Sequence, residues 1–459
     1  MTEQVYAHFI GVGGAGMSGI AHVLHERGVA VSGSDLKLSR YARHLADEGV
    51  RVSIGHDASN LGDPEIVVVS SAIPEANPEL AEARRRGIPV WQRAKMLAHL
   101  AGEQKTIAVA GTHGKTSTSS MIAQMLAEMG EDPTFLIGGE LNDMGANARC
   151  GRGRWYVVEA DESDGSFLHL SPYVAVVTNV EADHLDHYSG IEEVRETFAA
   201  FLSNVEAQGV AVLCADAPGL LELAAACPAR VVTYGRAPQA DVRLVALAQD
   251  GLGHRFEVSL PGGGSAEGRI SLPGEHMALN ATAAVAVAHA LGLDPVRAAA
   301  ALALFTGVRR RFELVGEVDG ITVVDDYAHH PTEVAATLAG ARKAGFERIW
   351  VVFQPHRYSR TAALGRDFGS VFEDADRVVL MDVYGAGETP IPGVSGKTLV
   401  DAVLQQRPRS RVAYFPHRAD VEPYVTSNAR AGDLVMTMGA GDVTAIGGDL
   451  VRALVARRA

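Results

Sequence analysis

The stretch TIAVAGTHGKTSTS, residues 106–119, decides how the middle of this 459-residue sequence folds. Its apolar run 106–110 predicts a buried strand, and the residues from Lys115 onward predict a helix. The glycine-rich turn between them would point backbone N–H groups at a phosphate, while Lys115 adds a compact positive charge and the Thr116 hydroxyl reaches Mg²⁺. The motif is shorter than the usual phosphate loop, because Val109 stands where a glycine would open it. A glycine-rich helix start without a ligand is the alternative interpretation. We predict that this α/β unit binds ATP with Gly111, Thr112, His113, Gly114, Lys115, Thr116 and Ser117.

Two acidic segments follow the next predicted strands, at 155–159 and 174–178. EADESDGSFL (159–168) begins as its strand ends, and VTNVEADHLDHY (177–188) carries a run of acids and histidines. Carboxylate oxygens suit a hard ion such as Mg²⁺, and a carboxylate at the end of a strand beside a phosphate loop would hold that ion against the phosphates. Solvated loop residues are the alternative for both segments. We expect Glu159 to contribute to a metal site.

A second glycine-rich turn, GVGGAG at 11–16, lies between a predicted strand at 7–12 and a predicted helix. The helix buries an apolar stripe at helical spacing: Met17, Ile20, Ala21 and Leu24. Glycines in a G-x-G-x-x-G arrangement let the backbone approach a diphosphate, and an acid that closes the next strand is placed to bind a ribose. A tight structural turn is the alternative. We predict a site for a dinucleotide-like diphosphate ligand at this turn, with Gly11, Gly13, Gly14, Gly16, Asp35 and Ser71 as its candidate contacts.

The rest of the chain continues the alternation of strands and helices, which favours parallel sheets with crossover helices. Residues 241–272 predict a small antiparallel addition, and an Ala-rich helix follows from 276 to about 291. Five further strands lie beyond a candidate hinge at 307–313. Two loops there, 323–334 and 353–361, each leave a strand with His, Tyr and Arg clustered, so that arginines could clamp a carboxylate or phosphoryl group. We place three domains at 1–103, 104–311 and 312–459.

Composition excludes several functional classes. The formal net charge of −14 leaves no basic field for nucleic acid or an anionic membrane. The three cysteines, Cys150, Cys214 and Cys227, have no metal spacing and fit a reducing compartment. No apolar run reaches the roughly 18 residues of a membrane span, and the first residues lack the pattern of a signal peptide. We expect a cytoplasmic protein that binds no nucleic acid and does not insert into membranes.

Ten motifs in order make the chain similar to the Mur ligase family: GVGGAGMSGIA, GTHGKTSTSSM, EADESDGSFL, VEADHLDHY, GEHMALNA, FTGVRRRFE, DDYAHHPTEV, QPHRYSRT, DVYGAGE and GAGDVT. The resemblance implies an α/β fold of three domains: a Rossmann-like N-terminal domain for the UDP moiety, a central P-loop ATPase domain and a Rossmann-like C-terminal domain that closes on both. It implies an ATP- and Mg²⁺-dependent amide ligase that joins L-alanine to the lactyl carboxylate of UDP-N-acetylmuramic acid through an acyl phosphate.

The resemblance also assigns roles to single residues. It implies Thr116, Glu159 and His184 as metal contacts, and Asn280, Arg311 and Asp325 (or Asp326) as further nucleotide contacts. The catalytic residues would be Lys115, His329, Arg357 and Arg360, with His329 as a possible base for the alanine amine. The carboxylate and alanine would be surrounded by Tyr327, His329, His356, Arg357 and Arg360.

The sequence departs from the family pattern at two places. Met277 stands where family members commonly have an asparagine that faces adenine. Several sister ligases use a carbamylated lysine downstream of the metal histidine, whereas this chain has no lysine between Lys115 and Lys343.

Three alternative functions remain. They are a ligase that attaches a whole peptide, a nicotinamide-dependent oxidoreductase built on the glycine-rich turn at 11–16, and a UDP-sugar sensor without catalysis.

Overall fold

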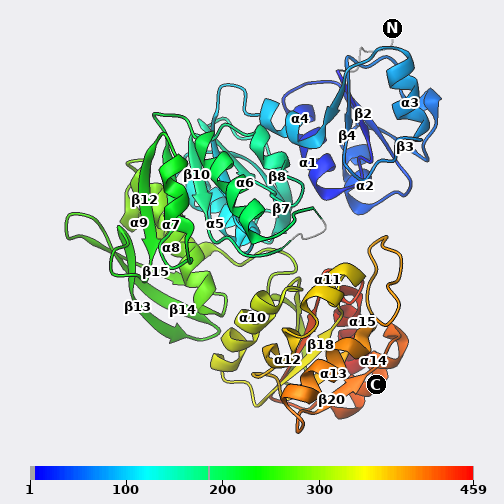
Figure 1. The fold of residues 1–459 in the computed structure, drawn as a ribbon, viewed down its shortest axis with the longest axis vertical. Helices are drawn as coiled ribbons and strands as arrows, with labels where there is room; N and C mark the ends of the chain where they lie inside the picture. The colour runs from blue at the N-terminus through cyan, green and yellow to red at the C-terminus, as the bar shows by residue number, and fades with distance from the viewer. Residues whose placement is uncertain (1–5, 184–186, 458–459) are drawn as a thin grey trace. The chain divides into compact units, whose positions relative to one another are not determined.

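A computed structural model describes residues 6–183 and 187–457. These residues form two compact units. The first unit comprises residues 1–243 and 282–301, and the second comprises 244–281 and 302–459. Figure 1 shows the ribbon coloured along the chain. In the described residues no helix combines the length and the apolar character that a membrane crossing requires.

The first unit opens with a sheet of five parallel strands in the order β3-β2-β1-β4-β5, blue in Figure 1. Its strands are β1 (Ala7–Ile10), β2 (Val31–Asp35), β3 (Arg51–Ile54), β4 (Ile66–Val69) and β5 (Val90–Gln92), and its helices are α1 (Ala15–Glu26), α2 (Arg40–Asp47), α3 (Pro78–Arg85) and α4 (Arg93–His99). The four apolar residues predicted to face the sheet from α1 are all buried. Because β2 and β4 flank β1, the glycine turn, Asp35 and Ser71 follow three adjacent strands at one edge.

A buried carboxylate holds this sheet to α3. Glu79 has no exposed surface, and its two oxygens contact His8 Nε2 at 3.0 Å, Ser34 Oγ at 2.5 Å and Asn60 Nδ2 at 2.9 Å. Burial alone would raise the pKa of Glu79, but the hydrogen bonds from these three residues lower it to about 2. The carboxylate is therefore ionised at neutral pH and joins β1, β2 and α3 beneath the glycine turn.

The same unit contains the central sheet, in which β6 lies between β10 and β9 with all three strands parallel. The order in this unit is β12-β11-β10-β6-β9-β7-β8, and only the last pair is antiparallel among the described pairings. The strands are β6 (Lys105–Ala110), β7 (Thr134–Leu141), β8 (Ala146–Arg149), β9 (Trp155–Glu159), β10 (Val174–Val177), β11 (Val210–Cys214) and β12 (Arg230–Gly235). The helices are α5 (Lys115–Glu128), α6 (Ile191–Ser203), α7 (Leu220–Leu223) and α9 (Pro295–Ala301), and α8 (Glu275–Ala290) enters from the second unit.

The second unit carries β13 (Val242–Asp250), whose first two residues belong to the first unit, with β14 (Gly253–Ser259) and β15 (Ser265–Ile270). β14 and β15 are antiparallel, as the sequence predicts for 241–272. A six-stranded sheet follows in the order β16-β17-β21-β18-β19-β20, antiparallel only at β16 among its described pairings. Its strands are β16 (Glu313–Val318), β17 (Ile321–Asp326), β18 (Arg348–Phe353), β19 (Arg377–Leu380), β20 (Val412–Tyr414) and β21 (Asp433–Met438).

Helices cover both faces of this last sheet. They are α10 (Pro331–Lys343), α11 (Tyr358–Leu364), α12 (Phe368–Val371), α13 (Gly396–Gln406), α14 (Arg418–Asn428) and α15 (Thr444–Ala456). Successive residues of β18 alternate between two buried clusters: Val351 and Phe353 belong to one, and Trp350 and Val352 to the other. Because side chains of a strand alternate between the faces of a sheet, each cluster is the core on one side.

The fold confirms the predicted α/β class and most of the predicted strands. β9 has the predicted bounds, and β6 and β10 differ from theirs by one residue at one end. No strand is predicted from the sequence at β3, β7 or β8. None of the four residues of β3 is buried, so its pairing with β2 holds it in the sheet. In β7 a short buried apolar run, 134–137, is followed by two glycines that weaken the strand pattern.

Candidate active site

The predicted phosphate loop connects β6 to α5 in a conformation that requires glycine. Gly111 has a φ of 134°, and a Cβ there would lie 2.1 Å from Thr178 Oγ1. The loop is fastened to the end of β10, because His113 N donates to Asn179 Oδ1 at 2.8 Å and Thr178 Oγ1 donates to the His113 carbonyl at 2.6 Å. Gly114, with a φ of 83°, begins the helix. The turn is therefore shaped by close backbone approach, as a phosphate-binding turn has to be.

Lys115 lies at the start of α5 with its ammonium inside a cage of oxygens. Its Nζ donates to the Gly111 carbonyl at 2.6 Å, to the Thr112 carbonyl at 3.3 Å and to Glu162 Oε1 at 2.8 Å. Burial alone would lower the pKa of Lys115, but Glu162 raises it, with smaller contributions from Glu159 and another nearby acid. The ammonium is therefore charged at neutral pH and stands beside the loop that would receive a triphosphate.

Thr116 and Glu159 meet at the carboxyl ends of β6 and β9. Thr116 Oγ1 donates to Glu159 Oε1 at 3.1 Å, and the other carboxylate oxygen accepts from Gly138 N at 2.9 Å. A hydroxyl and a carboxylate beside a phosphate loop form the all-oxygen donor set that Mg²⁺ prefers, so these residues fit the predicted ion. His184, the third predicted metal contact, lies outside the described residues. Thr112 and Ser117 are buried in the same loop and helix.

The glycine turn at 11–16 lies at the matching edge of the first sheet. Gly14 is the residue before α1, and Gly13 N donates to Asp35 Oδ2 at 2.9 Å. Ser39 Oγ donates to the Gly13 carbonyl at 2.8 Å and also begins α2. Ser71 is exposed in the turn after β4. The structure thus brings together the residues predicted for a diphosphate and its ribose, with Asp35 in contact with the turn itself.

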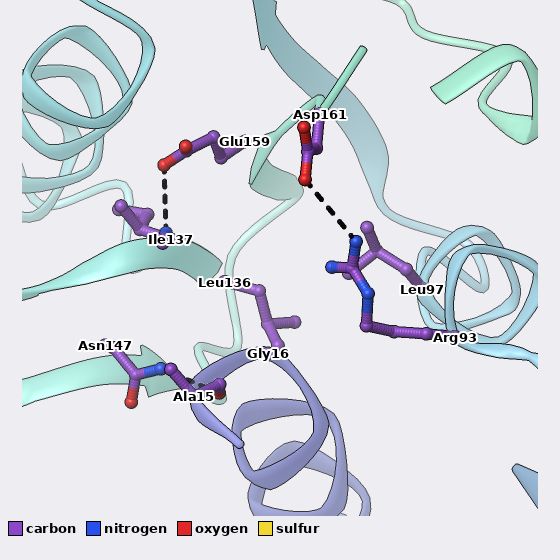
Figure 2. Close-up of a pocket in the computed structure, with 10 residues that line it drawn as sticks. Ala15, Gly16, Arg93, Leu97, Leu136, Ile137, Asn147, Glu159 and Asp161 are labelled. Atoms are coloured by element: carbon purple, nitrogen blue, oxygen red, sulfur yellow. Dashed lines mark hydrogen bonds and ion pairs between the residues drawn. The ribbon is translucent and has the colours of Figure 1, made fainter. Parts of the chain in front are cut away.

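A pocket extends from the glycine turn at 11–16 to Glu159, whose carboxylate contacts Thr116 (Figure 2). The start of α1 contributes Ala15 and Gly16 to its wall, and the end of β9 contributes Glu159. The remaining wall residues come from α4, from β7 and β8 and from the segment after β9: Arg93, Leu97, Leu136, Ile137, Gly138, Asn147 and Asp161. A ligand held at the turn of the first sheet would therefore reach the carboxylate that contacts the phosphate loop.

Arg93 is the cation of this pocket, and the sequence contained no signal for it. Its guanidinium lies 3.7 Å from Asp161 Oδ2, and a Cβ on Gly16 would approach its Nη1 to 3.2 Å. The side chain is 28% exposed, so an anion can reach it. A single arginine at the first position of a helix has no spacing to mark it, whereas Gly16 and Asp161 belong to motifs. Only the packing of α4 against α1 places Arg93 between them.

In the second unit, the two histidine-rich loops form one cluster. The rings of His329 and His356 have centroids 5.7 Å apart, and Tyr327 contacts His329 edge-on at 5.2 Å. Arg360 Nη1 lies 3.5 Å from His356 Nδ1, and Tyr384 stacks on His356 with an interplanar angle of 12°. Burial lowers the pKa of His356 to about 4, and the neighbouring His329 and Arg360 add to the effect. The imidazole is neutral at pH 7.

Arg357 precedes α11 in a strained backbone conformation. Its φ is 69°, and its N–H donates to the Tyr384 carbonyl at 2.8 Å. Non-glycine residues with a positive φ are rare and concentrate at functional sites. Ser359 is held by Glu388, which accepts from its hydroxyl at 2.6 Å. The four predicted residues Tyr327, His329, His356 and Arg360 are thus brought together with Arg357, and Tyr384 joins them from DVYGAGE.

The residues of the second unit that are predicted to contact the nucleotide form hydrogen bonds and ion pairs with other residues of that unit. Asp325 accepts from Thr437 Oγ1 at 2.6 Å and Thr444 Oγ1 at 2.7 Å, and it pairs with Arg310 at 3.2 Å. Asp326 accepts two backbone N–H groups, and burial raises its pKa to about 6.

The two other predicted contacts of this unit are also held locally. The guanidinium carbon of Arg311 lies 5.1 Å from the Tyr327 ring centroid. Asn280 is 7% exposed, and its amide nitrogen lies 4.0 Å from Met277 Sδ. Nucleotide binding by Asp325, Arg311 and Asn280 stays a prediction.

Comparisons with known proteins find similar sequences and structures over nearly the whole chain. Three family models match: the catalytic domain of the Mur ligase family at 6–105, the Mur ligase middle domain at 109–288 and the glutamate ligase domain of Mur ligases at 310–441. The UDP-N-acetylmuramate–L-alanine ligase of Rubrobacter xylanophilus is 52% identical over 97% of this chain and 99% of its own length.

Solved structures show the same architecture. The UDP-N-acetylmuramate-alanine ligase of Thermotoga maritima has a TM-score of 0.84 and 28% identity, with 99% of this chain and 100% of that one covered. A murein peptide ligase of Psychrobacter arcticus follows with a TM-score of 0.73 and 26% identity, covering 98% of each chain.

Proposed function

The chain belongs to the Mur ligase family, and we propose that it forms the amide bond between L-alanine and the lactyl carboxylate of UDP-N-acetylmuramic acid, with cleavage of ATP to ADP and phosphate. This is an acid–amino-acid ligase reaction of peptidoglycan precursor synthesis. The pocket of Figure 2 carries the proposal, because it leads from the turn suited to a diphosphate to the carboxylate beside the phosphate loop. A UDP-sugar anchored at Gly13 and Gly14 would present its acid end near Lys115.

ATP is needed in this reaction to convert a carboxylate oxygen into a leaving group. A carboxylate oxygen is a poor leaving group, so an amine does not displace it at a useful rate. In the proposed first step, a lactyl carboxylate oxygen attacks the γ-phosphorus, a new O–P bond forms, and the bond to ADP breaks. In the second step, the alanine nitrogen attacks the acyl carbon, a C–N bond forms, phosphate leaves with the C–O electron pair, and the amine loses a proton.

The described residues of the first unit supply the positive charge for the first step. We assign Lys115 to the phosphates, where its ammonium neutralises charge on the transferring group. Thr116 and Glu159 would hold Mg²⁺, which supplies a further positive charge when bound. Arg93 is placed to bind the lactyl carboxylate or the diphosphate, and its ion pair with Asp161 at 3.7 Å would fix its direction.

The cluster of the second unit is suited to the second step. Arg357 and Arg360 can bind the alanine carboxylate by paired N–H groups. His329 Nδ1 lies 3.0 Å from the Tyr327 carbonyl, so in the neutral ring Nδ1 carries the hydrogen and Nε2 is the basic nitrogen. We assign His329 to accept the amine proton. The neutral state of His356, whose pKa is about 4, avoids adding a charge that would repel the amine.

A peptide ligase is the second candidate, because a murein peptide ligase shares the fold over nearly the whole chain. Such an enzyme would attach a tripeptide where the proposed one attaches alanine. Phosphate release distinguishes the two: UDP-N-acetylmuramic acid, ATP and Mg²⁺ are held constant while single amino acids and a tripeptide are compared. The proposal expects release with L-alanine at the highest kcat/KM, and none without the UDP-sugar. Faster release with the tripeptide than with alanine would reassign the chain.

A further inference from the structure

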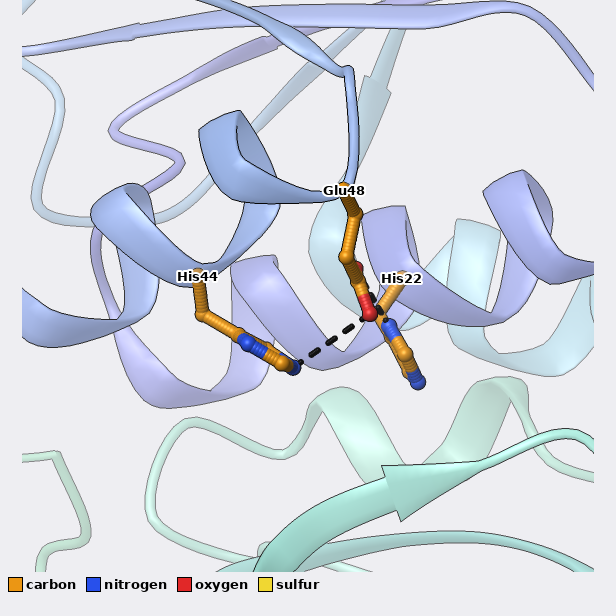
Figure 3. Close-up of side chains that lie close together, drawn as sticks. All are labelled: His22, His44 and Glu48. Atoms are coloured by element: carbon orange, nitrogen blue, oxygen red, sulfur yellow. Dashed lines mark hydrogen bonds and ion pairs between the residues drawn. The ribbon is translucent and has the colours of Figure 1, made fainter.

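We propose a transition-metal site on the first α/β sheet, separate from the phosphate loop and formed by His22, His44 and Glu48. Figure 3 shows His22 on α1 and His44 on α2 pointing at the carboxylate of Glu48, the residue that ends α2. Their ligand atoms all lie within 4.8 Å of one another. The chemical class of ligand is a divalent ion that accepts imidazole and carboxylate together, and Zn²⁺ is the ion we commit to.

The spacing of these residues along α1 and α2 places their side chains on helical faces that point toward each other. His22 and Glu26 are four residues apart on α1, and His44 and Glu48 are four apart at the end of α2, so each pair lies on one helical face. The two pairs also face each other. Glu48 Oε2 lies 2.8 Å from His22 Nδ1, and Glu48 Oε1 lies 3.4 Å from His44 Nε2. Glu26 Oε2 lies 3.2 Å from the other ring nitrogen of His22, Nε2, and also accepts from Cys150 N at 2.8 Å, so Glu26 can orient the imidazole.

These distances match what a zinc ion demands. With bonds of about 2.0–2.2 Å in a tetrahedron, neighbouring ligand atoms lie about 3.4 Å apart. Glu48 lies 2.8 Å from His22 and 3.4 Å from His44, near that spacing, and every pair of ligand atoms is within 4.8 Å. Three protein ligands also leave a fourth position for water.

The surroundings favour a cation and allow it to enter. α1 and α2 both end near the cluster, and the C-terminal end of a helix carries partial negative charge that attracts cations. The His44 side chain is 65% exposed, whereas those of His22 and Glu48 are 15% and 27% exposed. An ion can therefore arrive at His44 from solvent and then contact the two more buried ligands.

A bound ion would have a consequence for the sugar site. Gly14 of the glycine turn immediately precedes α1, and Ser39, whose hydroxyl donates to the Gly13 carbonyl, immediately precedes α2. The ion would join the opposite ends of the same two helices. It would therefore hold the frame of the diphosphate turn without touching the substrate, and its effect would be on stability rather than on the chemical step.

The test is Zn²⁺ titration of the full chain by calorimetry, in excess Mg²⁺ so that sites made of oxygen ligands alone are filled. His44→Gln and His22→Gln remove one imidazole each, and His169→Gln, at an exposed histidine elsewhere, is the matched control. We expect each ligand variant to bind this Zn²⁺ at least about tenfold more weakly, while the control binds as the unaltered chain does. Because His44 is exposed, its replacement leaves the fold intact.

Two further readouts decide the proposal. Zn²⁺ should raise the thermal midpoint of the unaltered chain and of His169→Gln but not of His44→Gln, since an ion that binds only the folded state stabilises it. Co²⁺ in place of Zn²⁺ should produce a visible absorption band that both ligand variants lack. Equal Zn²⁺ affinity and stoichiometry in the unaltered chain and in His44→Gln would overturn the site, as would a Co²⁺ band that survives in both variants.

Discussion

At the scale of single residues, the candidate site depends on how buried charges are balanced. Lys115 is surrounded by oxygens, and its three N–H donors are taken by two carbonyls and Glu162, which is 2% exposed. One oxygen of Glu162, Oε2, is buried and has no hydrogen-bond partner among the described residues. A phosphate entering the loop would replace part of this cage with stronger, charge-assisted hydrogen bonds.

Lys115→Ala should abolish ligase turnover while UDP-sugar binding persists. The substitution removes the ammonium beside the transferring phosphoryl group, and losses of such cations lie in the range of about a thousandfold or more in kcat. The glycine turn at 11–16 is unaffected because it belongs to another sheet. Phosphate release and UDP-sugar calorimetry measure the two properties, with Lys105→Ala, an exposed lysine at the start of the same β6, as control. Full activity of Lys115→Ala would remove the phosphate loop from the mechanism.

His356 should make stability depend on pH in acid. Burial lowers its pKa from 6.5 to about 4, so between these values the unfolded chain binds more protons than the folded one. The contribution of His356 to the free energy of unfolding is therefore fully present above pH 6.5 and is lost as the pH falls toward 4. His356→Gln lacks the group, so its stability deficit relative to the unaltered chain should narrow as the pH falls. Urea unfolding across this pH range measures the deficit, with His169→Gln as control; a constant deficit would contradict the assignment.

At the scale of elements, most site residues lie at the carboxyl end of a parallel strand or in the turn and first helical residues that follow it. Such turns all open at the carboxyl edge of a sheet, where ligands of open α/β sheets bind. Order within the sheet decides which turns become neighbours. β6 lies between β10 and β9, so its loop meets Asn179 on one side and Glu159 on the other.

Gly111→Ala should destabilise the phosphate loop severely. The residue has a φ of 134°, and the added methyl carbon would lie 2.1 Å from Thr178 Oγ1. Strained backbone and a close contact together should lower the free energy of unfolding by at least about 2 kcal/mol, and ATP binding should weaken with it. Urea unfolding and nucleotide titration report the two effects. Gly264→Ala is the control, since a Cβ there meets its nearest atom at 3.9 Å. Equal stability of the two variants would show that the loop can relax.

At the scale of the whole molecule, the groups proposed for the reaction are divided between two units. The phosphate loop, Glu159 and Arg93 belong to the first, whereas His329 and Arg360 belong to the second. Ligation then requires the units to act on one substrate pair, and closure would exclude water from the acyl phosphate. Closure stays a prediction from the family resemblance.

Arg360→Ala should separate substrate binding from turnover. The arginine belongs to the second unit, so UDP-sugar affinity, a property of the first, should be unchanged. Loss of a positioned cation in the amino-acid cluster should lower kcat by about a hundredfold or more. Calorimetry with the UDP-sugar and phosphate release measure the two quantities. Arg366→Ala, an exposed arginine shortly after the same helix, is the control. A parallel loss of UDP-sugar affinity would argue against a division of labour between the units.

The α/β class, the three-domain family architecture and the two glycine-rich turns could be predicted from the residues alone. These are local properties: strand and helix periods, turn glycines and a lysine at a helix start lie within a few residues of one another. The same applies to Glu159, which ends a predicted strand, and to the histidine-rich loops. The family resemblance added predictions for residues whose roles cannot be inferred from their spacing in the sequence.

Which side chains contact one another could not be predicted, because the contacts depend on how distant elements pack. Arg93 reaches the pocket because α4 packs beside α1, and Glu162 becomes the partner of Lys115 because β9 pairs with β6. Tyr384 stacks on His356 across 28 residues of chain, and His22 faces His44 across two helices. Such pairings depend on strand order and on helix packing, which many distant apolar contacts determine together. A motif states what chemistry a residue can perform, and the packed fold determines the partner with which it performs it.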